Sequence, residues 1–310
     1  TDGAATDIIV REGDAAPDGN GTFKYFSHLP PALNGSGLLG FYSTFEGTSG
    51  GNDDSTGVIC ADGATVKQLA RLGQDAPDGN GVYDFILDSS PNLNRFGEGA
   101  FCVRFDDTTG GSADDSGLVR GDGATQTQIV REGDSAPDGN GSFAHLSDDP
   151  ILSHSGRVTF QCEFTGTTGG SSDDSAIVIF DDSTGLLGAT REGDAAPDGN
   201  GAFGHMWKEP VANNAGQAAF YATFTGTSGG AGDDTAVVRA DGSSLDQLAR
   251  EGQPAPDGNG AFSGFSPTMA INDVGAVAFV ATFDGTSGGS SDNRGICLGD
   301  GAALTQMVRA

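Results

Sequence analysis

The stretch Pro17-Asp18-Gly19-Asn20-Gly21 decides the fold, because the same five residues return four more times along the chain. The later copies begin at Pro77, Pro137, Pro197 and Pro256, with spacings of 60, 60, 60 and 59 residues. Repetition at a fixed period is typical of proteins that stack one supersecondary unit. The 310-residue chain is therefore read as five copies of one unit.

Each unit contains four segments with strand-like patterns, and helix signals are absent. The first follows PDGNG and starts with an aromatic residue, such as Phe23. The second has two phenylalanines four apart, such as Phe41 and Phe45, which share one face of a strand and predict a buried stripe. The third is short and aliphatic, as at Val58-Ile59, and the fourth ends in an arginine, as at Arg71.

The links between these segments predict an antiparallel meander. An N-x-x-G turn such as Asn272–Gly275 joins the first two segments, and an Asp-Gly hairpin turn such as Asp62-Gly63 joins the last two. Four short antiparallel strands repeated five times predict an all-β fold, a five-bladed β-propeller of four-stranded antiparallel blades. An open β-solenoid shares the same repeat logic and stays the alternative. Five separate beads are disfavoured, because a glycine-rich unit of this size buries too little surface alone.

The expected blades cover residues 13–72, 73–132, 133–192, 193–251 and 252–310, which together make one domain over 13–310. Residues 1–12 are then a surplus N-terminal strand, because residues 2–11 align without gaps with residues 300–309. Such a strand can thicken a blade of its own chain, add to a blade edge in another subunit, or belong to a longer array.

The charge balance restricts the partners. With 43 acidic and 15 basic residues, the net charge of −28 argues against nucleic acid and against insertion into or binding to anionic membranes. The sequence has no initiator Met and no signal peptide, and we interpret it as a mature chain or a segment of a longer one. Few lysines and many Asp, Gly, Ser and Thr residues predict an extracellular setting. Asn20, Asn34 and Asn140 fit the acceptor pattern for N-glycosylation.

The pattern N-x-x-G-x-x-A-F occurs at residues 94–101, 213–220 and 272–279, with looser copies at 34–41 and 153–160. It resembles the bacterial "choice-of-anchor tandem repeat NxxGxxAF" proteins, and the resemblance covers all five units. This resemblance implies export to the bacterial cell surface and implies no activity. The strand order is also similar to the blades of periplasmic Tol-type propellers, which implies that the arginine-ended strand is the outer one.

Two acidic loops of each unit are expected at the same end of the blade, because successive strands alternate in direction. Calcium takes about six to eight oxygen ligands, and glycine-rich loops can turn carbonyl groups inward. One calcium ion per repeat is therefore predicted, although Asp-Gly and Asn-Gly can also be simple turn formers and the Asp pairs solvated charge. The predicted ligands are Asp14, Asp18, Asn20, Asp53, Asp54, Asp78, Asp114, Asp115, Asp134, Asp138, Asp173, Asp174, Asp194, Asp198, Asp233, Asp234, Asp257 and Asp292.

The arginines at the strand ends lie beside these acidic loops in the sequence. A structural ion pair that holds the loop is predicted for each of them, and not a substrate clamp. They are Arg11, Arg71, Arg131, Arg191, Arg250 and Arg309.

The four cysteines, Cys60, Cys102, Cys162 and Cys297, are expected to be free and buried. Cross-blade disulfides are the alternative. They require local approach of the blades, because packed sheets lie about 10 Å apart and a relaxed disulfide is shorter.

Enzymatic signals are weak. Of the four histidines, His145 and His205 occupy one column of the repeat, where the other units have Tyr25, Phe85 and Gly264, so a ring of metal-binding histidines is excluded. These two histidines and Trp207 are expected on the innermost strand, as filler or as ligand contacts. No zinc, nucleophile-elbow or phosphate-loop motif occurs, so we predict no enzyme and no catalytic residue.

The sequence-based hypothesis for function is an extracellular structural protein, stabilised by calcium, that self-associates by strand addition into a surface fibre. The alternatives are a calcium-dependent module that binds glycans as an adhesin, and an acidic hydrolase.

Overall fold

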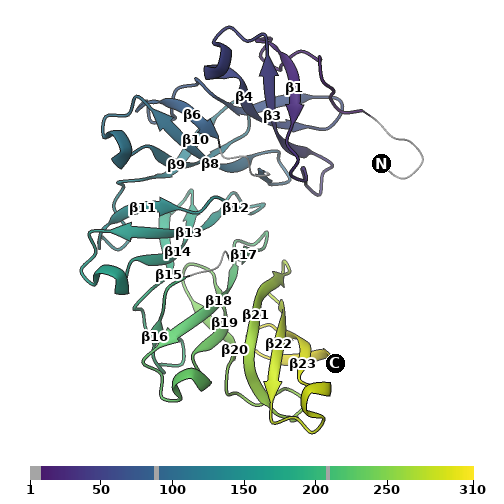
Figure 1. Ribbon diagram of the computed structural model, residues 1–310, viewed down its shortest axis with the longest axis vertical. Helices are drawn as coiled ribbons and strands as arrows, with labels where there is room; N and C mark the ends of the chain where they lie inside the picture. The colour runs from purple at the N-terminus through teal and green to yellow at the C-terminus, as the bar shows by residue number, and fades with distance from the viewer. Residues whose placement is uncertain (1–7, 87–90, 207–209) are drawn as a thin grey trace. The chain divides into compact units, whose positions relative to one another are not determined.

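The computed structural model describes residues 8–86, 91–206 and 210–310 (Figure 1). Trp207, expected on an innermost strand, lies outside these residues. Within them the strands form five antiparallel sheets, one for each repeat. The chain divides into two compact units: residues up to Asp134 together with Phe143–Gly156, and Ser135–Ser142 together with Arg157–Ala310. No helix in the described part is long and apolar enough to cross a lipid bilayer.

The first unit contains two complete sheets. The first has the order β1-β3-β4-β5, and the second has the equivalent order β6-β8-β9-β10. A two-residue strand, β2 or β7, pairs with the second long strand of each sheet. The bounds are β1 Thr22–Phe26, β2 Ala32–Leu33, β3 Leu39–Glu46, β4 Thr56–Ala61, β5 Val66–Arg71, β6 Val82–Ile86, β7 Asn92–Leu93, β8 Gly99–Asp106, β9 Ser116–Gly121 and β10 Gln126–Arg131. The unit also includes β12 (Ile151–Leu152) and all but the first residue of β11 (Ser142–Leu146).

The second unit repeats the pattern in the pairings β13-β14-β15, β16-β18-β19-β20 and β21-β22-β23-β24. Their bounds are β13 Val158–Thr165, β14 Ser175–Asp181, β15 Gly185–Arg191, β16 Ala202–Phe203, β17 Val211–Ala212, β18 Ala218–Thr225, β19 Thr235–Ala240, β20 Leu245–Arg250, β21 Ala261–Ile271, β22 Val277–Asp284, β23 Arg294–Gly299 and β24 Leu304–Arg309. A 3-10 turn follows the second long strand of every sheet: η1 Gly51–Asp54, η2 Gly111–Ala113, η3 Gly170–Ser172, η4 Gly230–Gly232 and η5 Gly289–Ser291. The prediction of an all-β chain of four-stranded antiparallel blades is confirmed.

The Asp-Gly turns form as predicted. The Asp62 carboxylate accepts the N–H groups of Ala64 and Thr65 at 2.9 and 2.8 Å, and Gly63 adopts a φ of 87°. A side chain other than glycine is strained at that φ, and Asp can hydrogen-bond the backbone two residues on. The Asp-Gly pair therefore closes the hairpin between β4 and β5.

The asparagines of the N-x-x-G turns shape their own turns, and two of them also reach the next repeat. Asn94 Oδ1 accepts the N–H groups of Phe96 and Glu98 at 2.9 and 3.1 Å, which shapes its own turn. Asn34 Nδ2 donates to the Asn94 carbonyl at 2.7 Å, which ties the first turn to the second. Asn213 and Asn272 repeat this contact at 2.9 Å in the second unit. The motif therefore connects neighbouring repeats.

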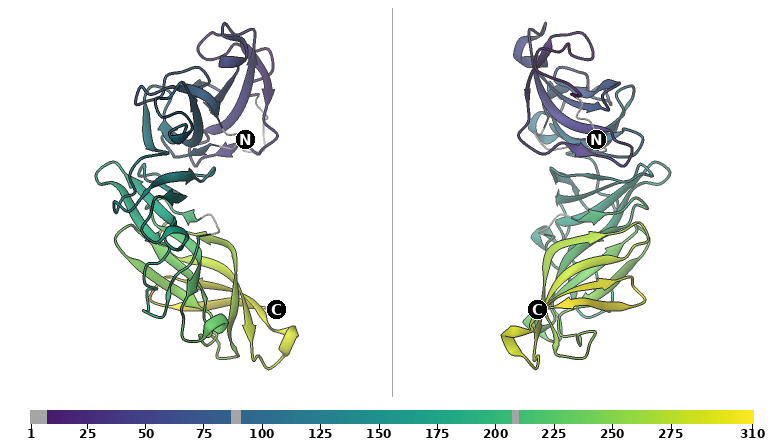
Figure 2. Two further views of the ribbon diagram at one scale, coloured as in Figure 1. Left: turned by 60° about the vertical axis from the view of Figure 1, so that its left-hand side comes forward. Right: turned by 90° about the vertical axis from the view of Figure 1, so that its right-hand side faces the viewer.

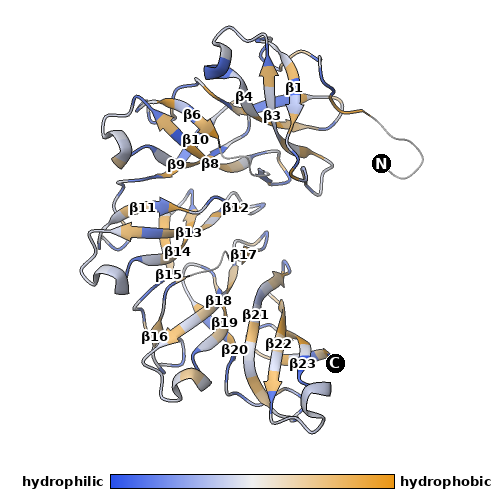
Figure 3. Ribbon diagram, in the orientation of Figure 1, coloured by the Kyte–Doolittle hydropathy of each residue, from blue (hydrophilic) through white to orange (hydrophobic). Residues whose placement is uncertain are grey.

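The apolar cores lie between consecutive blades. In the first unit Val58 on β4 packs with Tyr83, Phe101 and Phe105 of the next sheet. In the second unit Val237 on β19 belongs to one cluster with Phe262, Phe279 and Phe283. The fourth and fifth sheets, green and yellow, therefore lie face to face (Figures 1 and 2), and orange segments on β18 and β22 mark their apolar residues (Figure 3). In the second, fourth and fifth blades, the predicted phenylalanine stripe is thus the face that receives the preceding blade.

Residues 8–12 lie outside any strand, and residues 1–7, the rest of the predicted surplus strand, lie outside the described part, so this strand stays a prediction. Val10 instead packs against the cluster that contains Phe23, Phe26 and Phe41 on the first sheet. Residues 2–11 resemble residues 300–309 in their side chains. Side-chain similarity alone does not form a strand, because a strand also needs a neighbouring strand with which its backbone can pair.

All four cysteines are buried free thiols, as expected. Burial raises the pKa of Cys102 to about 12 and that of Cys297 to about 11, which makes these thiols poor nucleophiles.

Candidate functional site

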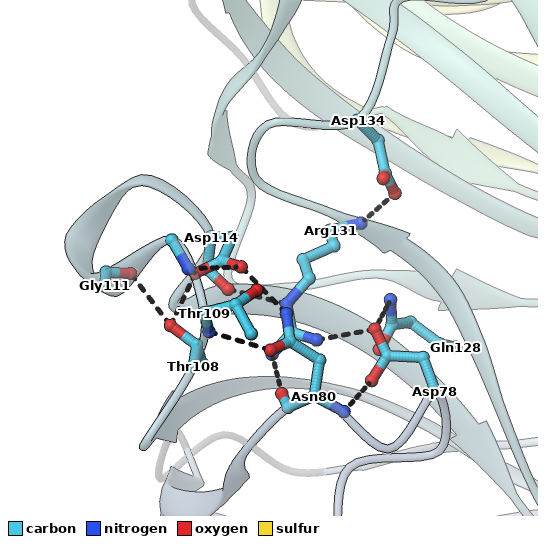
Figure 4. Close-up of polar contacts among 10 residues, drawn as sticks. Asp78, Asn80, Thr108, Thr109, Gly111, Asp114, Gln128, Arg131 and Asp134 are labelled. Atoms are coloured by element: carbon cyan, nitrogen blue, oxygen red, sulfur yellow. Dashed lines mark hydrogen bonds and ion pairs between the residues drawn. The ribbon is translucent and has the colours of Figure 1, made fainter.

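The arginine at the end of each fourth strand joins the two acidic loops of its own sheet. In the second sheet Arg131 Nη1 lies 2.6 Å from Asp78 Oδ2, Nη2 donates to the Asn80 carbonyl at 2.7 Å, and Nε donates to the Asp114 carbonyl at 2.6 Å (Figure 4). The guanidinium also lies 4.1 Å from the centre of the Phe105 ring. We call this arrangement the arginine clip.

The complete clip recurs in the first four sheets, and Arg309 of the fifth keeps the ion pair and the bond to the Asp292 carbonyl. The predicted structural ion pair is therefore confirmed for five of the six arginines. The partner aspartate belongs to the loop that enters the same sheet, 52 or 53 residues earlier, and not to the loop that follows the arginine. Arg11 precedes the first of these loops and is exposed. The other N–O distances are 2.7 Å for Arg71–Asp18, 2.7 Å for Arg191–Asp138, 2.6 Å for Arg250–Asp198 and 2.8 Å for Arg309–Asp257.

An asparagine completes the contact between the two loops. Asn80 Nδ2 donates to Asp114 Oδ2 at 2.8 Å, and Asn80 Oδ1 accepts the Thr109 N–H at 2.8 Å (Figure 4). The Thr108 hydroxyl, the Asn80 amide and the Gly110 N–H hold the pKa of Asp114 below its ordinary value against the effect of burial. This aspartate is therefore an anionic acceptor within the protein at neutral pH.

The aspartate early in the entering loop caps the preceding strand. Asp134 Oδ2 accepts the Arg131 N–H at 2.8 Å, and Asp194 accepts the Arg191 N–H at 2.8 Å. In the second repeat Gln74 Oε1 takes the same place and accepts the Arg71 N–H at 2.9 Å. A side-chain carbonyl makes this bond as well as a carboxylate does, which explains why glutamine is tolerated here.

The two acidic loops converge as predicted, and their carboxylates contact a guanidinium, an amide and backbone N–H groups. These contacts account for Asp18, Asp78, Asp138, Asp198 and Asp257 and for Asp54, Asp114, Asp173, Asp233 and Asp292. Asp53 is exposed on η1. Calcium binding at these loops stays a prediction. In each sheet the clip arginine places a positive charge next to the same acidic residues.

The second aspartate of the pair belongs to a different cluster. Asp174 lies at the start of β14, Glu192 follows Arg191 at the end of β15, and His205 follows β16. His205 Nδ1 lies 3.4 Å from Glu192 Oε2 and 3.7 Å from Asp174 Oδ1, and its Nε2 lies 3.7 Å from Glu163 Oε1. One ligand atom from each of Asp174, Glu192 and His205 lies within 4.8 Å of the other two. We call these three residues the carboxylate–histidine cluster.

The cluster is half-buried, and Glu192 is its most enclosed member, with a side chain 12% exposed. Burial raises the pKa of Glu192, and the Asp174 charge acts in the same direction, against the Ser175 hydroxyl and His205. Ser175 Oγ donates to Glu192 Oε2 at 3.1 Å and accepts the Met206 N–H at 2.9 Å, which fixes the carboxylate relative to β14.

The same positions in the first unit form a recess of about 430 Å³ lined by Asp115, Glu132 and His145. Arg104 also lines it and occupies the position that corresponds to Glu163. Burial and the Asp115 charge raise the pKa of Glu132.

Two other repeats lack the histidine. Asp234 and Glu251 keep the carboxylates but have Gly264 in the histidine column, and burial raises the pKa of Glu251. The first repeat has Ser55 and Leu72 in place of both carboxylates.

Asp115, Asp174 and Asp234 are among the acidic residues predicted from the sequence as metal ligands, and Glu132, Glu192 and Glu251 are not. The signal was present in the Arg-Glu-Gly triplets that end three of the fourth strands, together with the column of His145 and His205. The sequence predicts that both aspartates of a pair such as Asp173-Asp174 bind calcium at one site, whereas in the structure the second aspartate faces the carboxylate–histidine cluster.

A family model described as "Family of unknown function (DUF7453)" matches residues 1–186 and, in a second match, residues 88–310. No curated protein matches the chain.

Three solved structures illustrate the likeness to other proteins. An oligogalacturonate lyase in complex with manganese is 12% identical, with a TM-score of 0.40, over 98% of this chain and 73% of that one. Prolyl oligopeptidase B from Galerina marginata is 9% identical, with a TM-score of 0.44, and this chain spans 37% of its length. The β-propeller domain of the trilobed protease from Pyrococcus furiosus is 12% identical, with a TM-score of 0.35, over 93% of this chain and 86% of that domain. None of these likenesses carries an argument about activity.

Proposed function

We propose a structural, self-associating function for this chain, which belongs to the family of unknown function (DUF7453). We call the face of a blade that packs on the following blade its outgoing face. The face that packs on the preceding blade is its incoming face. The outgoing face of the fifth blade packs on the incoming face of the first blade of a second copy.

The exposed outgoing face of the fifth blade carries the proposal. On the first blade Val58 and Ala70 are each 1% exposed, because they cover the second blade, and on the fourth blade Val237 is fully buried. The corresponding residues of the fifth blade, Ile296 and Val308, are 43% and 52% exposed. Within its own unit, the fifth blade therefore leaves exposed an apolar surface whose counterparts on the first and fourth blades are buried.

The incoming face of the first blade also exposes an apolar side chain that is buried at the same position of another blade. Leu33 is 69% exposed, whereas Leu93 at the same position of the second blade is 9% exposed. An apolar recess of about 220 Å³ lies on this face, and Val10, Phe26 and Phe41 are among the residues that line it. Its partner in the other repeats is the outgoing face of a preceding blade, which argues for a second copy of this chain as the occupant.

Burial of apolar side chains between the fifth blade and the first blade of a second copy favours their association. Burying a fully exposed aliphatic side chain contributes about 1.5–3 kcal/mol, and a side chain that is already half-buried contributes a fraction of that. Four such side chains are available on the fifth blade, Val280, Ile296, Met307 and Val308. Because the two faces are different, the contact is heterologous and generates a ring or an open fibre. We propose the same extracellular, cell-surface location that the acidic, lysine-poor sequence predicts.

Sedimentation of the Ile296→Asp/Val308→Asp variant tests this function. We expect the unaltered chain to associate with rising concentration and the variant to sediment as a monomer with an unchanged far-UV circular dichroism spectrum. Ser290→Asp adds a charge on the exposed turn η5 and should associate like the unaltered chain. A monomeric unaltered chain at about 100 μM, in the micromolar to millimolar range of weak association, would overturn the proposal.

Deleting residues 1–7 separates face packing from strand addition. This deletion removes most of the surplus segment and leaves Val10 and the apolar recess. Association that survives it supports packing through the faces, whereas its loss supports strand addition.

A further inference from the structure

We propose that Asp174, Glu192 and His205 bind one zinc ion, at a site that shares Asp174 with the predicted calcium ligands and adds Glu192 and His205, which are not among them. The inference stands on the convergence of three ligand atoms, on the orientation of the imidazole and on the excess of negative charge around it. It is independent of the association of the end blades.

The spacing of the three ligand atoms fits a metal. Zinc is bound by histidine nitrogen and carboxylate oxygen at about 2.0–2.2 Å, and two ligands at a tetrahedral angle are then about 3.3–3.5 Å apart. His205 Nδ1 lies 3.4 Å from Glu192 Oε2 and 3.7 Å from Asp174 Oδ1. Small side-chain movements bring all three atoms to coordination distance.

Glu163 sets the orientation of the imidazole. A metal-binding histidine commonly donates its other ring N–H to a carboxylate, which fixes the tautomer and raises the basicity of the ligating nitrogen. Glu163 Oε1 lies 3.7 Å from His205 Nε2, whereas Asp174 and Glu192 lie near Nδ1. In this proposal Glu163 is a positioning residue that accepts the Nε2 proton when Nδ1 coordinates the metal.

The charge at the cluster favours a cation. Three carboxylates, from Glu163, Asp174 and Glu192, surround one imidazole. Asp174 Oδ1 is buried and accepts no hydrogen bond from the described residues. A buried carboxylate oxygen without a donor costs free energy, and coordination to a metal supplies its partner.

The donor set selects the class of metal. One nitrogen and two oxygens are too few for calcium, which takes about six to eight oxygens. An imidazole with carboxylates suits zinc and other divalent transition metals. Three protein ligands leave a position for water or a further ligand.

The other repeats act as internal comparisons. In the first unit Asp115, Glu132 and His145 repeat the ligand set, but Arg104 replaces the positioning carboxylate and adds a positive charge. We therefore expect weaker zinc binding there. The repeat with Gly264 lacks the nitrogen ligand altogether.

Competition with a chromophoric chelator, on the full chain stripped of metal, measures the affinity and the number of zinc ions. We expect one tight zinc ion. His205→Ala should lose it, with a decrease in affinity larger than the about 10- to 100-fold that is typical for second-shell changes. Glu163→Gln should fall within that 10- to 100-fold range and retain the d–d absorption of bound Co²⁺. A purely structural glutamate would leave the affinity unchanged.

His28→Ala changes an exposed histidine and should bind zinc as the unaltered chain does. Circular dichroism of the metal-free variants shows whether each is folded. The proposal is overturned if the folded chain binds no zinc, or if folded His205→Ala binds zinc with unchanged affinity. Since self-association is measured separately by sedimentation in the presence of chelator, either proposal can fail without the other.

Discussion

Arg131 and Asp78 are 53 residues apart in the sequence, and their Nη1 and Oδ2 atoms lie 2.6 Å apart. The arginine side chain is 4% exposed and the aspartate 33%. The pair therefore joins the first loop of a blade to its last strand under partial shielding from water. An equivalent ion pair lies in each of the other four blades.

Replacing Arg131 with methionine is expected to destabilise the first unit by about 3 kcal/mol, the lower end of the cost of breaking a buried ion pair. The substitution removes the guanidinium from Asp78 and from the carbonyls of Asn80 and Asp114. Urea unfolding followed by far-UV circular dichroism measures the change. Arg11→Met is the matched control, because Arg11 is exposed and precedes all clips, and should change stability by at most about 0.5 kcal/mol. Equal effects of the two substitutions would contradict the role of the clip.

Replacing Asn80 with aspartate should cost about 1–3 kcal/mol at neutral pH. The amide that donates to Asp114 becomes a carboxylate facing another carboxylate, and a donor in a partly buried network is lost. The same chemical change at Asn52, an exposed residue of η1, is the control. Thermal melts of the two variants compare the positions, and a loss at Asn52 as large as that at Asn80 would argue against the bridge.

Acid should destabilise the protein through the clip carboxylates. Burial alone would raise the pKa of Asp78, but the Asn80 N–H and Arg131 outweigh it and hold the pKa below its ordinary value. A lowered folded pKa contributes stability above the unfolded value of about 3.9, and this stability is lost as the pH falls through the folded pKa. Calorimetry should show a Tm that decreases on acidification below about pH 4. The decrease should be smaller in Arg131→Met, and a Tm that rises in acid would refute the assignment.

The calcium prediction has its own test. With a net charge of −28, removal of bound calcium by excess EGTA is expected to lower the Tm, because the acidic loops would repel one another more strongly. Added calcium should restore the Tm, and added zinc should not. An unchanged melt in excess EGTA, with no calcium found by elemental analysis, would leave the arginines as the source of positive charge at these loops.

The fold was largely predictable because local signals and the repeat agree. Phe101 and Phe105 define a buried face, and Asp122-Gly123 defines a hairpin, wherever the unit is placed in the chain. The surplus strand over residues 1–12 stays a prediction, because residues 8–12 lie outside any strand and residues 1–7 lie outside the described part of the chain. Side-chain similarity alone does not provide an edge with which the backbone can pair.

The sites were predictable only in part. An arginine beside acidic loops indicated an ion pair. That Arg131 pairs with Asp78 and not with Asp138 depends on the fold, which brings the last strand of the sheet next to the loop that enters the same sheet. The carboxylate–histidine cluster draws on Asp174, Glu192 and His205, from three different strand ends. No single motif contains them, so only the fold brings them together.

Every residue of a given clip comes from one repeat, as Asp78, Asn80, Asp114 and Arg131 all lie within residues 73–132. A duplicated or deleted repeat therefore brings or removes a complete set of polar partners and leaves none stranded in its neighbours. We expect genes of this kind to change their copy number by whole units, and chains with four or six repeats to keep the same local chemistry in each.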